Sequence, residues 1–196
     1  MTPMTLYRTI VADPPWRYTR NATPRIGGGA AAEHHYQTLS SDEIRDLFDP
    51  TLADAEAHLY LWVTNPVLLD MRRDIRGQSS PLDIVRAWGF EPAALLTWRK
   101  LGPLGLGFYY RGDTEHVIFA TKGGLGIPPS IRESNHFAAK KGRHSVKPDR
   151  FYEMVERVSP GPYLELFARR RRYGWDVWGD EAPEAAASQA EMGLGA

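Results

Sequence analysis

The sequence predicts an α/β domain built on a mostly parallel sheet with helices on both faces. Short apolar segments rich in β-branched residues alternate along the chain with segments whose apolar residues recur at helical spacing. Polar or basic residues directly follow several of the strand-like segments, at positions 13–16, 64–65, 99–100 and from 169 onward. Because ligands bind beyond the carboxyl ends of strands in such sheets, we expect the functional site at that edge.

Five strands are expected, with a short sixth near the end of the chain. The first, Tyr7–Ala12, contains β-branched residues that favour extended backbone. The others cover residues 58–63, 94–98, 115–123 and 163–169, and the short one covers residues 174–179. Residues 124–147 show neither helical nor strand periodicity, so no element is expected there.

Two helix starts are indicated by capping patterns. Ser40 followed three residues later by Glu43 is a capping box, so a helix is expected to begin there. Asn65 before Pro66 predicts an N-cap with proline at the first helical position. That helix is interrupted by a polar stretch and resumes in a segment that ends near Gly89.

The remaining segments complete the predicted domain. A further helix is expected within residues 147–158, where apolar side chains recur on one face. Residues 20–33 are Gly/Ala-rich and predict a loop, and the Ala/Glu-rich tail 182–196 is expected to be disordered. We therefore assign residues 1–181 to one domain.

Composition limits the classes of function. Hydrophobic residues make up 42% and charged residues 24% of the 196 residues, which is typical of a globular domain. Lys+Arg and Asp+Glu both number 24, so any contact with a polyanion must come from local basic patches such as 138–147 and 169–172. A solvated charged loop is the alternative for each patch.

The cysteine and histidine content and the hydropathy argue against disulfides, metal sites and membrane spans. The absence of cysteine excludes disulfides and thiolate metal sites, and the six histidines lack metal-ligand spacing, so no metal is expected. The start of the chain lacks a signal-peptide pattern, and no apolar run reaches membrane-span length. We expect a cytoplasmic protein with no membrane partner.

Asp13-Pro14-Pro15-Trp16 follows directly on the first predicted strand. Two prolines fix two φ angles and remove two N–H donors, so their carbonyls remain as acceptors at fixed positions. Asp13 adds a carboxylate and Trp16 adds a flat aromatic face. A planar ligand that carries an NH₂ group, such as adenine, suits this arrangement. A plain strand-ending turn is the alternative, because proline is common in turns.

This tetrapeptide after an apolar strand resembles the catalytic motif of the MT-A70 family of S-adenosylmethionine-dependent N6-adenine methyltransferases. Other segments are similar to that family in the same order, namely residues 35–44, 59–65, 98–100, 105–123, 144–156 and 164–179. The resemblance covers roughly residues 6–181. It implies a Rossmann-like class I methyltransferase fold with permuted motif order, in which the catalytic strand precedes the cofactor-binding strand.

The resemblance also implies the site residues. The catalytic set is Asp13, Pro14, Pro15 and Trp16, and the set for S-adenosyl-L-methionine is Asp13, Lys147, Glu165, Phe167, Arg169, Arg172, Asp180 and Glu181. Lys147 corresponds to a lysine near the methionine carboxylate. Glu165 corresponds to an acceptor of ribose hydroxyls, although a charge on a strand face is the alternative from the residues alone. The family often has Asn or His within 169–172, where this chain has four arginines.

The implied reaction needs an adenine presented beside Asp13. Hydrogen bonds from the exocyclic N6 to Asp13 and to the Pro14 carbonyl would localise the nitrogen lone pair, so catalysis would be mainly positioning and electrostatic stabilisation. The adenine must be unpaired or flipped out of a duplex. We expect Trp16 and Tyr18 to form apolar walls around it.

The sequence leaves the nucleic acid and the assembly open. Lys140, Lys141 and Arg143 are expected to hold substrate phosphates, with mobile solvent loops as the alternative. We favour DNA, because bare-domain members of the family resemble bacterial or phage proteins. The alternatives are RNA, a non-catalytic nucleic-acid-binding partner subunit, and a methyltransferase of small molecules or protein amides. Self-association or a separate partner subunit is compatible with the zero net charge.

Overall fold

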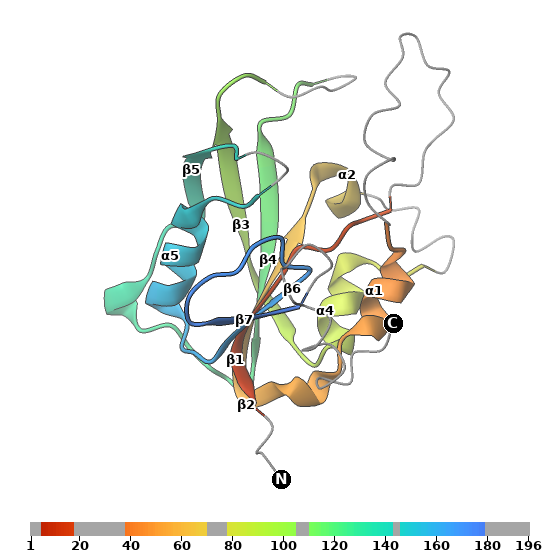
Figure 1. Ribbon diagram of the computed structural model, residues 1–196, viewed down its shortest axis with the longest axis vertical. Helices are drawn as coiled ribbons and strands as arrows, with labels where there is room; N and C mark the ends of the chain where they lie inside the picture. Colours follow the sequence, from red (N-terminus) through yellow and green to blue (C-terminus); the bar gives the residue numbers. More distant parts are fainter. Residues whose placement is uncertain (1–4, 18–37, 70–77, 105–109, 143–145, 179–196) are drawn as a thin grey trace.

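The computed structural model describes residues 5–17, 38–69, 78–104, 110–142 and 146–178. Within these residues, seven strands form one sheet in the order β5-β3-β4-β2-β1-β6-β7 (Figure 1). The strands are β1 (Tyr7–Ala12), β2 (Ala53–Val63), β3 (Glu91–Leu101), β4 (Thr114–Lys122), β5 (His136–Lys140), β6 (Tyr163–Leu166) and β7 (Trp175–Trp178). The helical segments are α1 (Ser41–Leu47), η1 (Pro50–Leu52), α2 (Asn65–Leu68), α4 (Pro81–Ala87), η2 (Pro129–Ile131) and α5 (Asp149–Val158).

Most neighbouring strands run parallel. The pairs β1–β2, β1–β6, β6–β7 and β3–β5 are parallel, whereas β4 is antiparallel to both β2 and β3. Ala12 at the end of β1 pairs with Leu61 on β2 and with Leu166 on β6. These three strands therefore end close together, and the residues that follow β1 lie at the carboxyl edge of the sheet.

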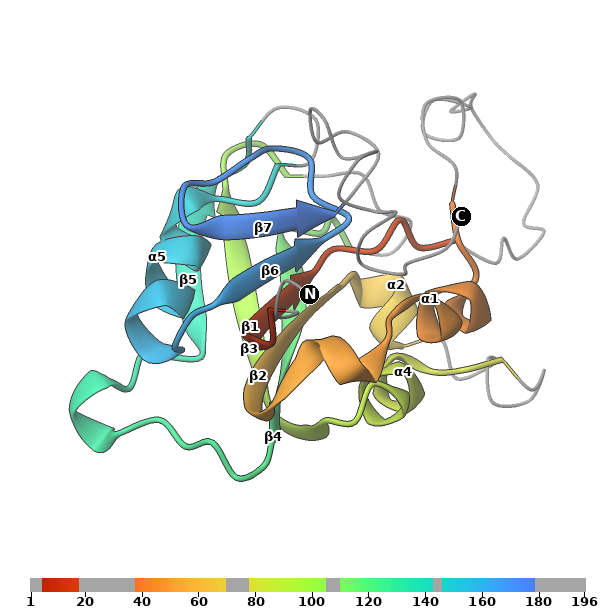
Figure 2. The same ribbon diagram turned by 60° about the horizontal axis from the view of Figure 1, so that its bottom comes forward.

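Helices cover both faces of the sheet, and α5 lies on the face opposite to α1, α2 and α4 (Figure 2). Side chains of β2 alternate between the two cores, because successive residues of a strand point to opposite faces. Leu59 and Leu61 belong to the core on the α4 side, and Tyr60 and Trp62 belong to the core on the α5 side. The predicted Rossmann-like α/β fold class is confirmed.

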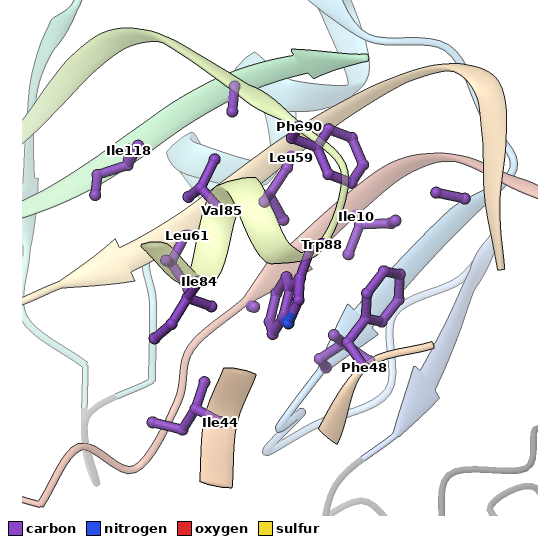
Figure 3. Packing of buried hydrophobic residues seen from close by; sticks show 14 of the residues in the cluster. Ile10, Ile44, Phe48, Leu59, Leu61, Ile84, Val85, Trp88, Phe90 and Ile118 are labelled. Carbon is purple, nitrogen blue, oxygen red and sulfur yellow. The ribbon is translucent and has the colours of Figure 1, made fainter. Parts of the chain in front are cut away.

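The core on the α4 side is built from aliphatic strand residues capped by aromatic rings (Figure 3). Ile84 and Val85 of α4 and the adjacent Trp88 are fully buried against it. Phe48 and Trp88 lie with ring centroids 5.0 Å apart. Burying a side chain of this size stabilises the fold by roughly 1.5–3 kcal/mol, so this face fixes α1 and α4 on the sheet.

The capping predictions were half right. Ser40 and Glu43 form the expected capping box at the start of α1. Asn65 is not an N-cap: Thr64 occupies that position, without a capping side-chain bond. The Asn65 amide instead donates to the Thr114 hydroxyl at 3.1 Å and accepts from His116 Nε2 at 2.8 Å. These tertiary partners on β4 compete successfully for a side chain that local sequence assigned to the helix.

The prediction that residues 124–147 lack an element was wrong, because β5 lies within them. This strand is at the edge of the sheet, where it pairs in parallel with β3. Phe137 is its one buried residue, so it carries no periodic apolar signal. The strands β2 and β3 are also longer than expected, because neighbouring strands extend them: β1 pairs with Ala53 of β2, and β4 and β5 pair with the two ends of β3.

Gly123 ends β4 at a place where no side chain fits. Its φ angle is +66°, and an added Cβ would lie 1.9 Å from the Ala55 carbonyl oxygen. Gly124 also has positive φ, at +78°, but has open space around its Cα. We expect Gly124→Ala to lower the free energy of unfolding by about 1–2 kcal/mol and Gly123→Ala to lower it by roughly 3 kcal/mol or more. Urea unfolding of both variants checks this, and equal losses would contradict the packing argument.

Candidate active site

The Asp13-to-Trp16 corner is held by backbone hydrogen bonds beyond the end of β1. The Asp13 N–H donates to the Leu166 carbonyl at 3.4 Å, which ties the corner to β6. The Pro14 carbonyl accepts from the Trp16 N–H at 2.9 Å, and the Pro15 carbonyl accepts from the Leu39 N–H at 2.8 Å. Both proline carbonyls thus already accept one hydrogen bond. A carbonyl has two lone pairs, so each retains capacity for one more.

Trp16 differs from the open flat face that the sequence led us to expect. It is only 5% exposed and packs in the core on the α4 side. Its Nε1 donates to the Trp62 carbonyl at 2.9 Å. A large ring with one polar atom is most stable where its surface is buried and its N–H is bonded, so the side chain anchors the corner to β2.

Asp13 belongs to a row of four alternating charges. Lys147 Nζ lies 3.0 Å from Asp13 Oδ1 and 2.9 Å from Glu115 Oε2. Lys100 Nζ lies 2.5 Å from the other oxygen of Glu115. The Lys147 ammonium also lies 4.7 Å from the centroid of the Trp62 ring. Three elements distant in sequence therefore converge on the buried ammonium.

Two members of the row, Lys147 and Glu115, favour their ionised forms despite burial. Burial alone would lower the pKa of Lys147, but Asp13 and Glu115 outweigh it and the pKa is raised. Burial alone would raise the pKa of Glu115, but Lys147 and Lys100 outweigh it and the pKa is lowered. At neutral pH Glu115 is consequently a carboxylate and Lys147 an ammonium group.

Glu165 lies on β6 with one carboxylate oxygen satisfied and the other not. The Tyr152 hydroxyl donates to Oε1 at 2.6 Å. Oε2 is buried and accepts no hydrogen bond from the described residues. Burial and then the charge of Asp13 raise the pKa of Glu165 to about 7, against the Tyr152 hydrogen bond, which lowers it. A buried acceptor in this state fits a ligand that donates a hydrogen bond, such as a ribose hydroxyl.

Two of the arginines after β6, Arg170 and Arg172, pair with acidic residues of helix α5. Arg172 makes a two-pronged pair with Glu156, at 2.7 and 2.8 Å. Arg170 pairs with Asp149 at the start of the same helix. The guanidinium groups of Arg170 and Arg172 lie 5.4 and 5.2 Å from the Tyr152 ring centroid. The role predicted for Arg172 in cofactor binding stays a prediction; the residue lies between β6 and β7 and pairs with Glu156 of α5.

Other predicted residues lie around the same edge. Phe167 follows β6 with a φ angle of 62°, and its ring lies 5.2 Å from that of Trp178. Arg169 is half-buried in the loop after β6. Lys140 is the last residue of β5 and Lys141 follows it, and both are exposed. Tyr18, Arg143, Asp180 and Glu181 lie outside the described residues, as does the predicted tail.

Two clefts are present in the described part of the chain. One, of about 430 Å³, adjoins the charged row and is lined by Ala139, Lys140, Gly142, Val146, Lys147, Pro148, Asp149, Arg150 and Arg170. The other, of about 370 Å³, is apolar and lies between α4 and β3. It lacks the acidic and basic side chains that the chemistry requires, so we place the site at the first cleft and Asp13.

Sequence reasoning missed Glu115, Tyr152 and Trp62 as members of the site. The rule that ligands bind beyond the carboxyl ends of strands directs attention to residues that follow strands. Glu115 instead lies near the beginning of β4. Because β4 is antiparallel to β2, His116 pairs with Val63 at the end of β2. The start of β4 therefore reaches the edge where the parallel strands end, and a rule for antiparallel neighbours could have found Glu115.

The fold and the site define a Rossmann-like methyltransferase with its acidic corner after the first strand. The MT-A70 family profile matches residues 7–181. The chain therefore belongs to the MT-A70 family. It is an S-adenosylmethionine-dependent enzyme that methylates the N6 amine of adenine in nucleic acid.

Named relatives extend along most of the chain. The type II methyltransferase M.MunI of Mycoplasma sp is 28% identical over 93% of this chain and 80% of its own length. The N6-methyladenosine RNA methyltransferase MTA1 of Pyricularia oryzae is 31% identical over 89% of this chain and 46% of its own length. The N(6)-adenosine-methyltransferase catalytic subunit METTL3 of Homo sapiens is 29% identical over 83% of this chain, which spans 26% of METTL3.

No helix in the described ranges is both long and apolar enough to cross a bilayer.

The raised pKa of Glu165 predicts a pH-dependent cost in stability. Its pKa is about 7 in the folded protein against an ordinary 4.5. Unfolding therefore releases a proton between these values, and burial of the carboxylate destabilises the fold increasingly from pH 4.5 to 7 and fully above 7. Glu165→Gln keeps an acceptor for Tyr152 without the charge. We expect it to raise the free energy of unfolding at pH 8 by about 1–3 kcal/mol.

Urea unfolding of the wild type and of Glu165→Gln at pH 5 and pH 8 measures the effect. The exposed Glu56→Gln is the control, since no comparable burial applies to it. A difference between wild type and Glu165→Gln that does not grow with pH would contradict the burial of an uncompensated carboxylate.

Proposed function

We propose that the chain methylates adenine N6 in DNA, with the amine held at Asp13. The observation that carries this proposal is that the carboxylate after β1 is fixed by a buried lysine at the edge where β1, β2 and β6 end together. A carboxylate at that place accepts hydrogen bonds from an amine and offers it no competing donor.

The choice of DNA is supported by the relative that is matched over most of its own length. Among the relatives named above, M.MunI is matched over the largest share of its own length, 80%, and we take its type II class as indicating DNA. The relatives named for RNA or adenosine methylation extend well beyond the matched region. We therefore favour DNA, and RNA is the alternative.

The residues around Asp13 fit S-adenosylmethionine. When bound, the cofactor supplies a methyl group on a sulfonium sulfur. Glu165 Oε2 is a buried acceptor that would hold a ribose hydroxyl. Lys147 uses two of its three donors on Asp13 and Glu115, so one is available for the methionine carboxylate. Phe167 and Arg169 lie on the loop after β6, where the remaining cofactor contacts are proposed.

Asp13 and the corner would position the substrate amine. The Asp13 carboxylate accepts one N–H of N6, and the second lone pair of the Pro14 carbonyl is available for the other. Fixed acceptors favour a nitrogen with a localised lone pair, and they need no reorganisation during the reaction. The base must be unpaired or flipped to reach them. Trp16 would act by holding the corner in place.

The cytoplasmic location, and self-association or a partner subunit, are predictions from the sequence that we keep as proposals. The one-domain boundary at residue 181 is likewise a proposal, although the family match ends at that residue.

Asp13→Ala should abolish methylation, which corresponds to a loss of at least about 100-fold. The assay uses a labelled methyl donor with adenine-containing oligonucleotides of DNA and RNA, each single-stranded and double-stranded. Circular dichroism of the variant controls for folding. Normal turnover by Asp13→Ala would contradict the mechanism, and methylation confined to RNA would contradict the choice of DNA.

Lys140→Glu with Lys141→Glu should weaken oligonucleotide binding through lost phosphate contacts. Each lost contact reduces the slope of log affinity against log salt by about 0.7–0.9. Fluorescence anisotropy measures the affinity and this slope at salt concentrations between roughly 50 and 200 mM, the range over which such contacts weaken. Arg86→Glu is the control, because Arg86 is exposed on α4, which covers the face of the sheet opposite to α5. An unchanged affinity and slope would rule out phosphate contacts at these lysines.

A further inference from the structure

Glu115 occupies the centre of the charged row without belonging to the predicted site. Both of its carboxylate oxygens bind lysines, Oε2 to Lys147 at 2.9 Å and Oε1 to Lys100 at 2.5 Å. Its side chain is 16% exposed, compared with 8% for Lys147 and 22% for Lys100. The row thus passes from the buried Asp13 toward the surface, and Glu115 is the link between the site and its outer end.

We propose that Glu115 is a positioning residue for methyl transfer, which shares the ammonium of Lys147 with Asp13 and is itself held by Lys100. This inference rests on the proposed function, because it concerns the carboxylate that receives the substrate amine.

The sharing of one ammonium between two carboxylates determines what Asp13 can offer a substrate. Lys147 contacts Asp13 through Oδ1. A buried ammonium needs compensation by anions, so without Glu115 it would move onto Asp13 and engage more of its lone pairs. Those lone pairs are the acceptors that the amine requires. Glu115 therefore keeps the lysine from becoming a competitor of the substrate.

The surroundings of the ammonium leave it little other freedom. The Trp62 ring lies on one side, with its centroid 4.7 Å from Lys147 Nζ, and Trp62 itself packs against Phe151 of α5 at 4.8 Å. The ammonium can shift between the two carboxylates but is blocked by the ring. A purely structural salt bridge is a weak explanation for Glu115, because a buried ion pair often adds little net stability.

The test is the kinetics of Glu115→Gln on a DNA oligonucleotide. We expect kcat to fall by about 10–100-fold, since small misplacements at a reacting centre have effects of this size. KM for the oligonucleotide should stay within about threefold, because most of the affinity for a nucleic acid comes from phosphate contacts that Glu115 does not make. Glu56→Gln is the control and should keep the wild-type kcat. It breaks an exposed pair with Arg8 at the opposite end of β1 and β2 from the site.

A double-mutant cycle tests whether Glu115 acts through Lys147. In a Lys147→Met background, Glu115→Gln should change the residual rate by less than about twofold, since coupled residues are not additive. An equal fold-loss in both backgrounds, or a wild-type kcat for Glu115→Gln alone, would overturn the inference.

Lys100→Met provides a second variant if Glu115→Gln does not fold. It removes the ion pair between Lys100 and Glu115 and leaves the buried pair of Glu115 with Lys147 in place. We therefore expect kcat to fall by roughly three- to tenfold. An unchanged kcat for Lys100→Met would overturn the inference. Failure of the wild type to methylate any adenine substrate would contradict the proposed function itself, whereas an active wild type with unaffected variants contradicts only the role of Glu115.

Discussion

The compensation of the buried Lys147 ammonium is the constraint on which the site depends. An isolated charge in a protein interior is strongly unfavourable, so the lysine is tolerated only where anions surround it. Asp13 follows β1, Glu115 is the second residue of β4, and Lys147 precedes α5. Because the ammonium binds both carboxylates, the charge that supports the chemistry also connects three separate parts of the chain.

The sheet topology makes this convergence achievable. The parallel strands β1, β2 and β6 end in register, which brings the Asp13 corner beside the end of β6. The antiparallel β4 contributes its first residues to the same edge, since His116 pairs with Val63. An all-parallel sheet would have placed the start of that strand at the opposite end. One reversed strand is therefore what gives the site its second carboxylate.

The sequence predicted those features that depend on local pattern. The first strand, the Ser40 capping box and the corner at Asp13 are each indicated by a signal that spans only a few neighbouring residues. The edge strand β5 and the bonding of Asn65 were missed, because they depend on pairing with β3 and β4. Family resemblance supplied Lys147 and Glu165, and periodicity alone would not have distinguished them from ordinary strand or loop charges.

Two buried polar groups differ in whether the described part of the chain satisfies their hydrogen bonds. His58 is fully buried, yet its ring nitrogens bond Ser159 at 2.8 Å and the Leu125 carbonyl at 3.0 Å. Tyr60 completes that network through the same Ser159 hydroxyl. The network is satisfied by the protein alone, so it specifies packing and leaves nothing for a ligand to bond. Glu165 retains a buried oxygen to which no described residue donates, and the fold sustains that unfavourable group at the edge where Asp13 and Lys147 meet.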